Sequence, residues 1–157
     1  MEQHEITAPI PLLDRQGNLT QAGYARRLLP EYDRSKVKGG LTRLKEWDYY
    51  LVMNDRFALA LTIADNSYMG LDSISLLDFD RGWQVTKSPM RLLPMGRTGL
   101  PATSERGDTA VAGKGYGLFF RAGGGKRLLV AHMDDFRDGQ ALDARVVLTG
   151  EPAEPMV

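Results

Sequence analysis

Glu46 and Asp48 are the first residues of this sequence whose types and spacing suit chemistry. They lie two positions apart in the run "LKEWDYYLVMND". Side chains two positions apart in a strand point to the same side. Both carboxyl groups therefore share one face, at about the separation that retaining glycosidases use. Every Glu-x-Asp strand has this geometry, so the pair alone does not indicate an enzyme.

The strand that would carry this pair has two assignments. In the first, Trp47 and Tyr49 lie on an aromatic core face, and Glu46 and Asp48 lie on a charged outer face. In the second, the charged face points inwards, and burial shifts the pKa values of both carboxyl groups. The first assignment is the plainer account, but alternation alone fits both.

His132 and Asp134 form a second pair on one face of a strand, about 6.5 Å apart by strand rise. The other histidine is His4, and the chain has no cysteine. A metal site would therefore lack further ligands, and neither a metal nor a cofactor is predicted. A hydrogen-bonded strand histidine is the simpler interpretation. No residue is assigned as catalytic, and the candidate ligand-binding residues are Glu46, Trp47, Asp48, Tyr49, Tyr68, His132 and Asp134.

Two glycine-rich runs resemble phosphate-binding loops only superficially. "AGGGK" at 122–126 lacks the full P-loop spacing and leads into a strand-like run. "GKGYG" at 113–117 has no helix behind it whose N-terminus could hold a phosphate. Both runs predict hairpin turns.

Length and charge limit the classes of partner. A chain of 157 residues is enough for one domain with a core of its own. Its 20 basic and 20 acidic residues cancel, so no cationic field indicates a nucleic-acid partner. The N-terminus lacks the pattern of a signal peptide, and no apolar run reaches membrane-spanning length. We therefore expect no membrane span and a cytoplasmic location.

From Lys45 onward, the sequence predicts a mainly β domain. Short alternating runs are separated by turn residues at intervals typical of an antiparallel meander, which forms a lipocalin-like barrel or a β-sandwich. The run "YMGLDSISLLDF" is apolar on both faces, as in a strand covered on both sides. The long segment 94–108 suits a binding loop, a lid or a partner contact, and it fits a surface loop without a task equally well.

The chain before Lys45 is predicted to be less regular. Thr20 is expected to cap a short helix over residues 21–29, which Pro30 ends. We divide the chain into an irregular arm with this helix (1–44), an antiparallel β-domain (45–150), and a tail or the start of a linker (151–157).

Six blocks of the sequence together are similar to a known family. They are "PLLDRQGNL", "EYDRSKVKGG", "RLKEWDYYLVMND", "ALTIADNSYMGLDSISLLDF", "LLPMGRTGLP" and "EPAEPMV". In this order they resemble the N-terminal half of the domain of unknown function 2804 family, over essentially the whole chain. Members of that family are typically longer, with a second half whose tryptophan- and glycine-rich motif is absent here.

This resemblance implies the first half of a tandem β-rich protein, similar to the lipocalin-like pairs of the carotenoid hydratase and AttH group. Likeness of fold is a weak ground for function. Two non-enzymatic roles are expected: binding of an apolar or amphipathic small molecule, or packing against a second β-domain or a second copy. The apolar space would be lined by Trp47, Tyr49, Phe57, Tyr68 and Phe120.

The alternative is an enzyme of the hydratase type that adds water to an isoprenoid double bond by acid catalysis. Its proton donor would be Glu46, Asp48 or Asp134, and each would need a pKa raised by an apolar pocket. Because no catalytic constellation is visible in the sequence, the non-enzymatic module is favoured.

Overall fold

The computed structural model describes residues 3–40 and 42–150 of the chain. Within these residues every regular element is a strand, apart from one turn of 3-10 helix, η1 (Arg34–Lys36). No helix in this part of the chain is long and apolar enough to cross a membrane. The predicted class, a mainly β protein, is confirmed.

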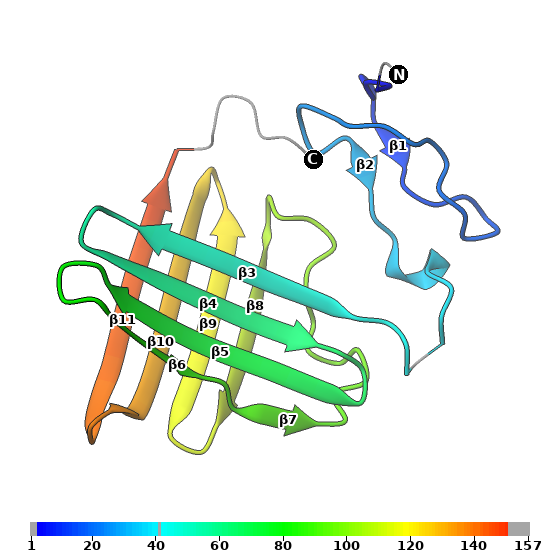
Figure 1. The fold of residues 1–157 in the computed structure, drawn as a ribbon. Coiled ribbons are helices and arrows are strands. Elements are labelled where there is room, and N and C mark those ends of the chain that lie inside the picture. The colour runs from blue at the N-terminus through cyan, green and yellow to red at the C-terminus, as the bar shows by residue number, and fades with distance from the viewer. Residues whose placement is uncertain (1–2, 41, 151–157) are drawn as a thin grey trace.

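Two antiparallel sheets face each other, with their strands crossing at a large angle (Figure 1). Neither sheet closes on itself, so the domain is a sandwich of the orthogonal kind. The front sheet in Figure 1 contains β3 (Glu46–Met53), β4 (Phe57–Asp65), β5 (Met69–Asp78) and β6 (Trp83–Lys87), with β7 (Met90–Leu92) paired to β5. The back sheet contains β8 (Gly107–Gly113), β9 (Tyr116–Gly123), β10 (Lys126–Arg137) and β11 (Gln140–Thr149).

The N-terminal arm lies beside the sandwich and contains β1 (Ile10–Pro11) and β2 (Pro30–Glu31), which pair in parallel (Figure 1). The helix predicted over residues 21–29 is wrong. Tyr24 instead bridges to Glu5, and the Thr20 hydroxyl donates to main-chain carbonyls in the β1 region. Such local bonds compete with helix formation, and a helix this short is marginal without packing. The tail predicted at 151–157 lies outside the described residues.

The core lies between the two sheets and is built from alternate residues of each strand. The fully buried residues include Leu61 and Ile63 of β4, Ile74 of β5 and Leu129 of β10. Together with Phe120 of β9 they belong to one continuous apolar cluster. The space between the sheets is thus filled by side chains of the domain itself.

Strand β3 takes the less expected of its two assignments. Tyr50 and Val52 pack against the core, and the Tyr50 ring meets the edge of Phe120 with 5.0 Å between centroids. Trp47 and Tyr49 point outwards, with 62% and 54% of their surfaces exposed. The plainer prediction of an aromatic core face on β3 is therefore wrong. Alternation fixes which residues share a face, but the tertiary partners decide which face is inside.

A buried ion pair links the two sheets. Asp72 of β5 is fully buried, and its carboxylate accepts hydrogen bonds from Arg91 Nε at 2.7 Å and Nη2 at 3.0 Å. It also accepts one from the Tyr116 hydroxyl of β9 at 2.8 Å. A side chain at Gly70, opposite Arg91 in the ladder, would clash with the guanidinium at 2.9 Å. We call Asp72, Arg91 and Tyr116 the interior clamp.

A second carboxylate extends the clamp to the loop between β7 and β8. Arg91 Nη1 donates to the Thr98 hydroxyl at 3.1 Å, and this hydroxyl donates to Asp65 at 2.9 Å. Burial alone would raise the pKa of Asp65, but hydrogen bonds from Gly96, Thr98 and Ser67 outweigh burial and hold it below its ordinary value. The pKa of Tyr116 is raised to about 12, mainly by burial and secondly by the hydrogen bond to Asp72.

Removing one partner of the clamp should destabilise the fold strongly. We expect Asp72→Ala to lower the free energy of unfolding by about 3 kcal/mol or more, because Arg91 and Tyr116 lose their buried acceptor. Urea unfolding followed by circular dichroism measures this. Asp108→Ala is the matched control, since it breaks an exposed Asp–Arg pair with Arg121. Equal effects of the two substitutions would show that the clamp does not hold the sheets together.

Candidate functional site

The two carboxylates of the "EWD" run point to the inner side of β3. Glu46 accepts a hydrogen bond from the Tyr32 hydroxyl at 2.8 Å and one from Arg34 Nε at 2.6 Å. Both partners come from the arm around η1, where Asp33 caps the turn. Arg34 neutralises Glu46, so this carboxylate fixes the arm to the start of β3.

Asp48 has a different environment. It is half-buried, and Thr109 Oγ1 of β8 donates to it at 3.3 Å. Within the described residues, no cation lies at ion-pair distance from Asp48. Burial raises the pKa of this carboxyl, and the Thr109 bond opposes the rise only in part. A carboxyl in this state can serve as a hydrogen-bond donor or a proton donor.

A small cavity connects Glu46 and Asp48 with the surface. Its volume is about 280 Å³. The loop between β7 and β8 closes one side, and the arm closes another. Its lining residues are Tyr32, Lys45, Glu46, Trp47, Asp48, Leu100 and Pro101.

The remaining candidate residues lie apart from this cavity. Tyr49 is on the outer side of β3, and Tyr68 lies exposed in the hairpin between β4 and β5. His132 and Asp134 lie on the outer face of the back sheet. The structure therefore brings together Glu46, Trp47 and Asp48, but it does not bring the other four to them.

His132 is held between two carboxylates. One ring nitrogen contacts Asp143 at 2.8 Å, and the other contacts Asp134 at 2.9 Å. Both bonds raise the pKa of the imidazole, and the bond to Asp143 has the larger effect. No group of three or more ligand side chains that could hold a metal ion occurs among residues 3–40 and 42–150.

The outward-facing residues of the front sheet form a second candidate site. We call this surface the outer apolar face. Large side chains follow edge strand β3 as a ridge, and small ones follow β4 beside it as a lane, paired Trp47–Ala64, Tyr49–Thr62, Leu51–Ala60 and Met53–Ala58. Farther from the ridge lie Met69, Leu71, Ser73, Ser75, Leu77, Gln84, Thr86, Met90 and Leu92.

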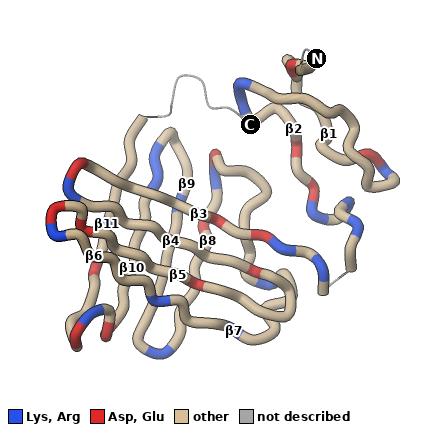
Figure 2. Tube along the Cα trace, viewed as in Figure 1, with Lys and Arg blue, Asp and Glu red and all other residues tan. Residues whose placement is uncertain are grey.

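None of these outward-facing residues on the described strands β3–β7 is charged. The long stretches of β4 and β5 without charge are visible in Figure 2, and the acids Asp65 and Asp72 point inwards. The outer face of the back sheet is the opposite case. It carries Asp108, Arg121, Lys126, His132, Asp134, Asp143 and Arg145. The outer face of the back sheet is therefore partly charged, and the outer face of the front sheet is uncharged.

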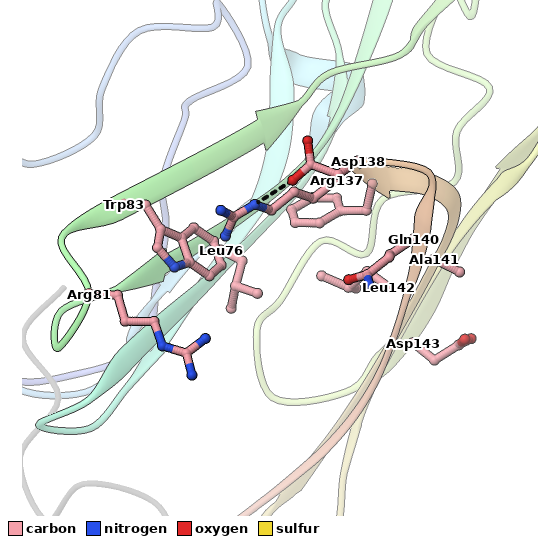
Figure 3. A pocket seen from close by; sticks show the side chains of 10 residues that line it. Leu76, Arg81, Trp83, Arg137, Asp138, Gln140, Ala141, Leu142 and Asp143 are labelled. Carbon is pink, nitrogen blue, oxygen red and sulfur yellow. Dashed lines mark hydrogen bonds and ion pairs between the residues drawn. The ribbon is translucent and has the colours of Figure 1, made fainter.

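A third candidate site is a groove between β6 and the hairpin that joins β10 to β11 (Figure 3). Its volume is about 550 Å³. The guanidinium of Arg137 lies over the Trp83 ring at 4.0 Å from its centroid. The other lining residues are Leu76, Arg81, Phe136, Asp138, Gln140, Ala141, Leu142 and Asp143.

Comparison with known proteins identifies the family. The profile described as domain of unknown function 2804 matches residues 3–157. The chain belongs to this family. Comparisons with curated proteins and with solved structures each found no match. The family's description assigns no activity.

Sequence reasoning missed the clamp and the groove at Trp83. One signal for the clamp is present, because Asp72 lies inside a run that is apolar on both faces. A lone acid in such a run indicates a buried partner of opposite charge. The groove left no comparable signal, since Trp83 and Arg137 are distant in the sequence and meet only in the fold.

Asp48 should destabilise the fold at neutral pH. A carboxyl whose pKa is raised in the folded state binds more protons there than in the unfolded state. Stability is therefore lost as pH rises from the ordinary aspartate pKa through the raised one. We expect Asp48→Asn to match the wild type near pH 3 and to exceed its free energy of unfolding at pH 7.

Urea unfolding at both pH values measures this difference, with Asp108→Asn as a control of opposite sign. The pKa of Asp108 is lowered by its bonds to Arg121. Its contribution to stability is present above the ordinary aspartate pKa and is lost as pH falls through the lowered one. Asp108→Asn should therefore lose more stability at pH 7 than near pH 3. A lower stability of Asp48→Asn at pH 7 would contradict the expected environment of Asp48.

Proposed function

We propose that this chain is a β-domain that packs against the sheet of a second β-domain through its outer apolar face. The observation that carries this proposal is the contrast between the two outer faces of the sandwich. The back sheet carries charges on its outer face, interspersed with apolar residues such as Phe119, Val130 and Val147. The front sheet has no charge along its outward-facing strand positions. Large exposed apolar surfaces of this kind mark interaction sites.

The chemistry of the face limits what can cover it. A partner that brings charges would lose their hydration without gaining a counter-charge. Ridge residues Trp47, Tyr49 and Leu51 stand beside the lane of Ala60, Thr62 and their neighbours. A complementary surface is therefore uncharged and places large side chains of the partner over the lane. The face of another β-sheet can supply such a surface.

The size of the face fits contact between domains. The sheet from β3 to β6 measures eight residues along β3, at about 3.3 Å each, by four strands about 4.8 Å apart. This is roughly 500 Å², so complete cover hides roughly 1,000 Å² in total, which is within the range of inter-domain contacts.

A second copy of the chain fits this face poorly. Consider two copies with their front sheets face to face, related by a two-fold axis that runs parallel to the strands between β3 and β4. In this dimer the ridge of each copy lies over the lane of the other copy. Only two strands of each copy then overlap, roughly 250 Å² per partner, against roughly 800 Å² in a standard interface. Shifting the axis to gain overlap sets the ridge over the polar Gln84 and Thr86 of β6. The favoured partner is therefore a different β-domain, in keeping with the resemblance to one half of a tandem β-protein.

Ligand binding between the sheets receives less support. Leu61, Ile74, Phe120 and Leu129 occupy that space. Trp47 and Tyr49, two of the aromatic residues expected to line a pocket there, lie on the outside.

Site-specific photo-crosslinking in cells of the source organism tests the proposal. A benzophenone amino acid in place of Leu51 should crosslink to a strand of another β-domain, because Leu51 lies in the middle of the ridge. The same amino acid in place of Val147 is the control. Val147 is also about half exposed but lies on the back sheet.

Sequencing of the crosslinked peptides decides the outcome. A crosslink from position 51 to a sheet of a different domain, absent from position 147, is the expected result. A crosslink to the same segment of another copy would replace the second domain by a homodimer. Equal labelling from both positions, or none from position 51, would overturn the proposal.

An acid-catalysed hydration is the second candidate function, and the environment of Asp48 favours it. Its raised pKa and position on a cavity are what a proton donor needs. In an assay of water addition to a short isoprenoid alkene, followed by mass spectrometry, we expect Asp48→Asn to abolish turnover. Asp134→Asn should leave it intact, because Asp134 is exposed on the back sheet. Absence of turnover in the wild type would remove this candidate.

A further inference from the structure

We propose that the groove between β6 and the β10–β11 hairpin binds an amphipathic carboxylate, with Arg81 and Arg137 on the acid group. This groove is separate from the outer apolar face and from the Asp48 cavity. Its volume of about 550 Å³ lies within the range of small-molecule sites. The inference does not depend on what covers the outer apolar face.

An irregularity in β10 builds the groove. The ladder between β10 and β11 shifts register between Met133 and Arg137. Met133 and Phe136 are both buried, although regular alternation would place them on opposite faces. The shift thus turns Phe136 into the core. It also places Arg137 over Trp83 (Figure 3). Bulges of this kind commonly re-aim side chains at functional sites.

Both arginines of the groove have hydrogen-bond donors that are not in use. Arg137 uses Nε on Asp138 at 3.2 Å, and among the described residues no hydrogen bond engages its two terminal nitrogens. Within the part of the chain that the structure describes, the Arg81 side chain has only a long ion pair to Asp78, with its Nε 3.9 Å from the carboxylate. Each acid of the groove has one partner, because Asp138 accepts from Arg137 and Asp143 contacts His132.

Unused hydrogen-bond donors favour a ligand with acceptor atoms. Because these donors belong to two positively charged guanidinium groups, they favour an anionic ligand. The planar fork of arginine matches a carboxylate with two parallel hydrogen bonds. Asp138 and Asp143 match the two arginines in formal charge, so the preference for a carboxylate rests on the free guanidinium donors and not on a net positive charge.

Part of the floor of the groove is apolar and can contact a hydrocarbon group behind the acid group. Phe136 and Leu142 are buried there, and Leu76 is partly buried against the same core. The Trp83 ring forms one wall, with Arg137 stacked on it (Figure 3). A hydrocarbon chain or ring laid on this floor would leave its carboxylate beside the two guanidiniums at the rim.

Isothermal titration with dodecanoate, below its micelle concentration, tests the site. Dodecanol, which has the same chain without the charge, should bind much more weakly. Arg81→Gln and Arg137→Gln should each weaken dodecanoate binding at least about tenfold, as expected for loss of a charge-assisted bond. Arg81 is largely exposed, so its replacement is a change that the fold tolerates.

Two control variants separate this groove from other surfaces. Arg121→Gln removes an arginine of the back sheet and should leave the affinity for dodecanoate unchanged. Leu51→Lys places a charge on the ridge and should also leave it unchanged. Absence of dodecanoate binding by the wild type, equal affinity for dodecanol, or loss of binding in Leu51→Lys alone would each overturn the proposal.

Discussion

The arrangement of the sandwich depends on where Asp72 points. A carboxylate in the middle of β5 has to be either in water or fully partnered, because an unpaired buried charge is very costly. Arg91 and Tyr116 supply the partners from two other strands, so Asp72 points inwards. Strand alternation then sends Leu71 and Ser73 outwards, and the β4–β5 register fixes the faces of β4. The clamp therefore fixes the inner packing and the composition of the outer apolar face together.

A sandwich needs only its two inner faces to be apolar. The back sheet follows this rule, with ion pairs such as Asp108–Arg121 on its outer side. The front sheet does not, although its outer face adds nothing to the core between the sheets. Exposed positions such as Trp47 and Met53 therefore need a cause beyond folding of this domain, and cover by a second sheet supplies one. That reasoning also accounts for a β5 that is apolar on both faces without requiring a closed barrel.

The sequence predicts the strands well because alternation is a local property. The shared faces of β4 and β9 and the turns between strands can all be read from neighbours within a few residues. The helix at 21–29 and the orientation of β3 could not be predicted in this way. Thr20 satisfies carbonyls of another segment, and β3 is oriented by Phe120 and Thr109 of the back sheet. The candidate residues of β3 therefore lie on two opposite sides of the strand. Spacing alone does not tell which of these sides faces the core.

Strand β3 inverts the usual relation between polarity and burial. Asp48 is half-buried with a raised pKa, while Trp47 beside it is mostly exposed. Each placement costs stability, and such local conflicts persist where function requires them. Trp47 connects the two sides, because it ends the ridge and also lines the cavity of Asp48. A domain that packs on the ridge therefore covers one wall of that cavity. In the proposed packing, such a domain would exclude water from this wall and raise the pKa of Asp48 further, which would couple the outer apolar face energetically to the acid on the inner side of β3.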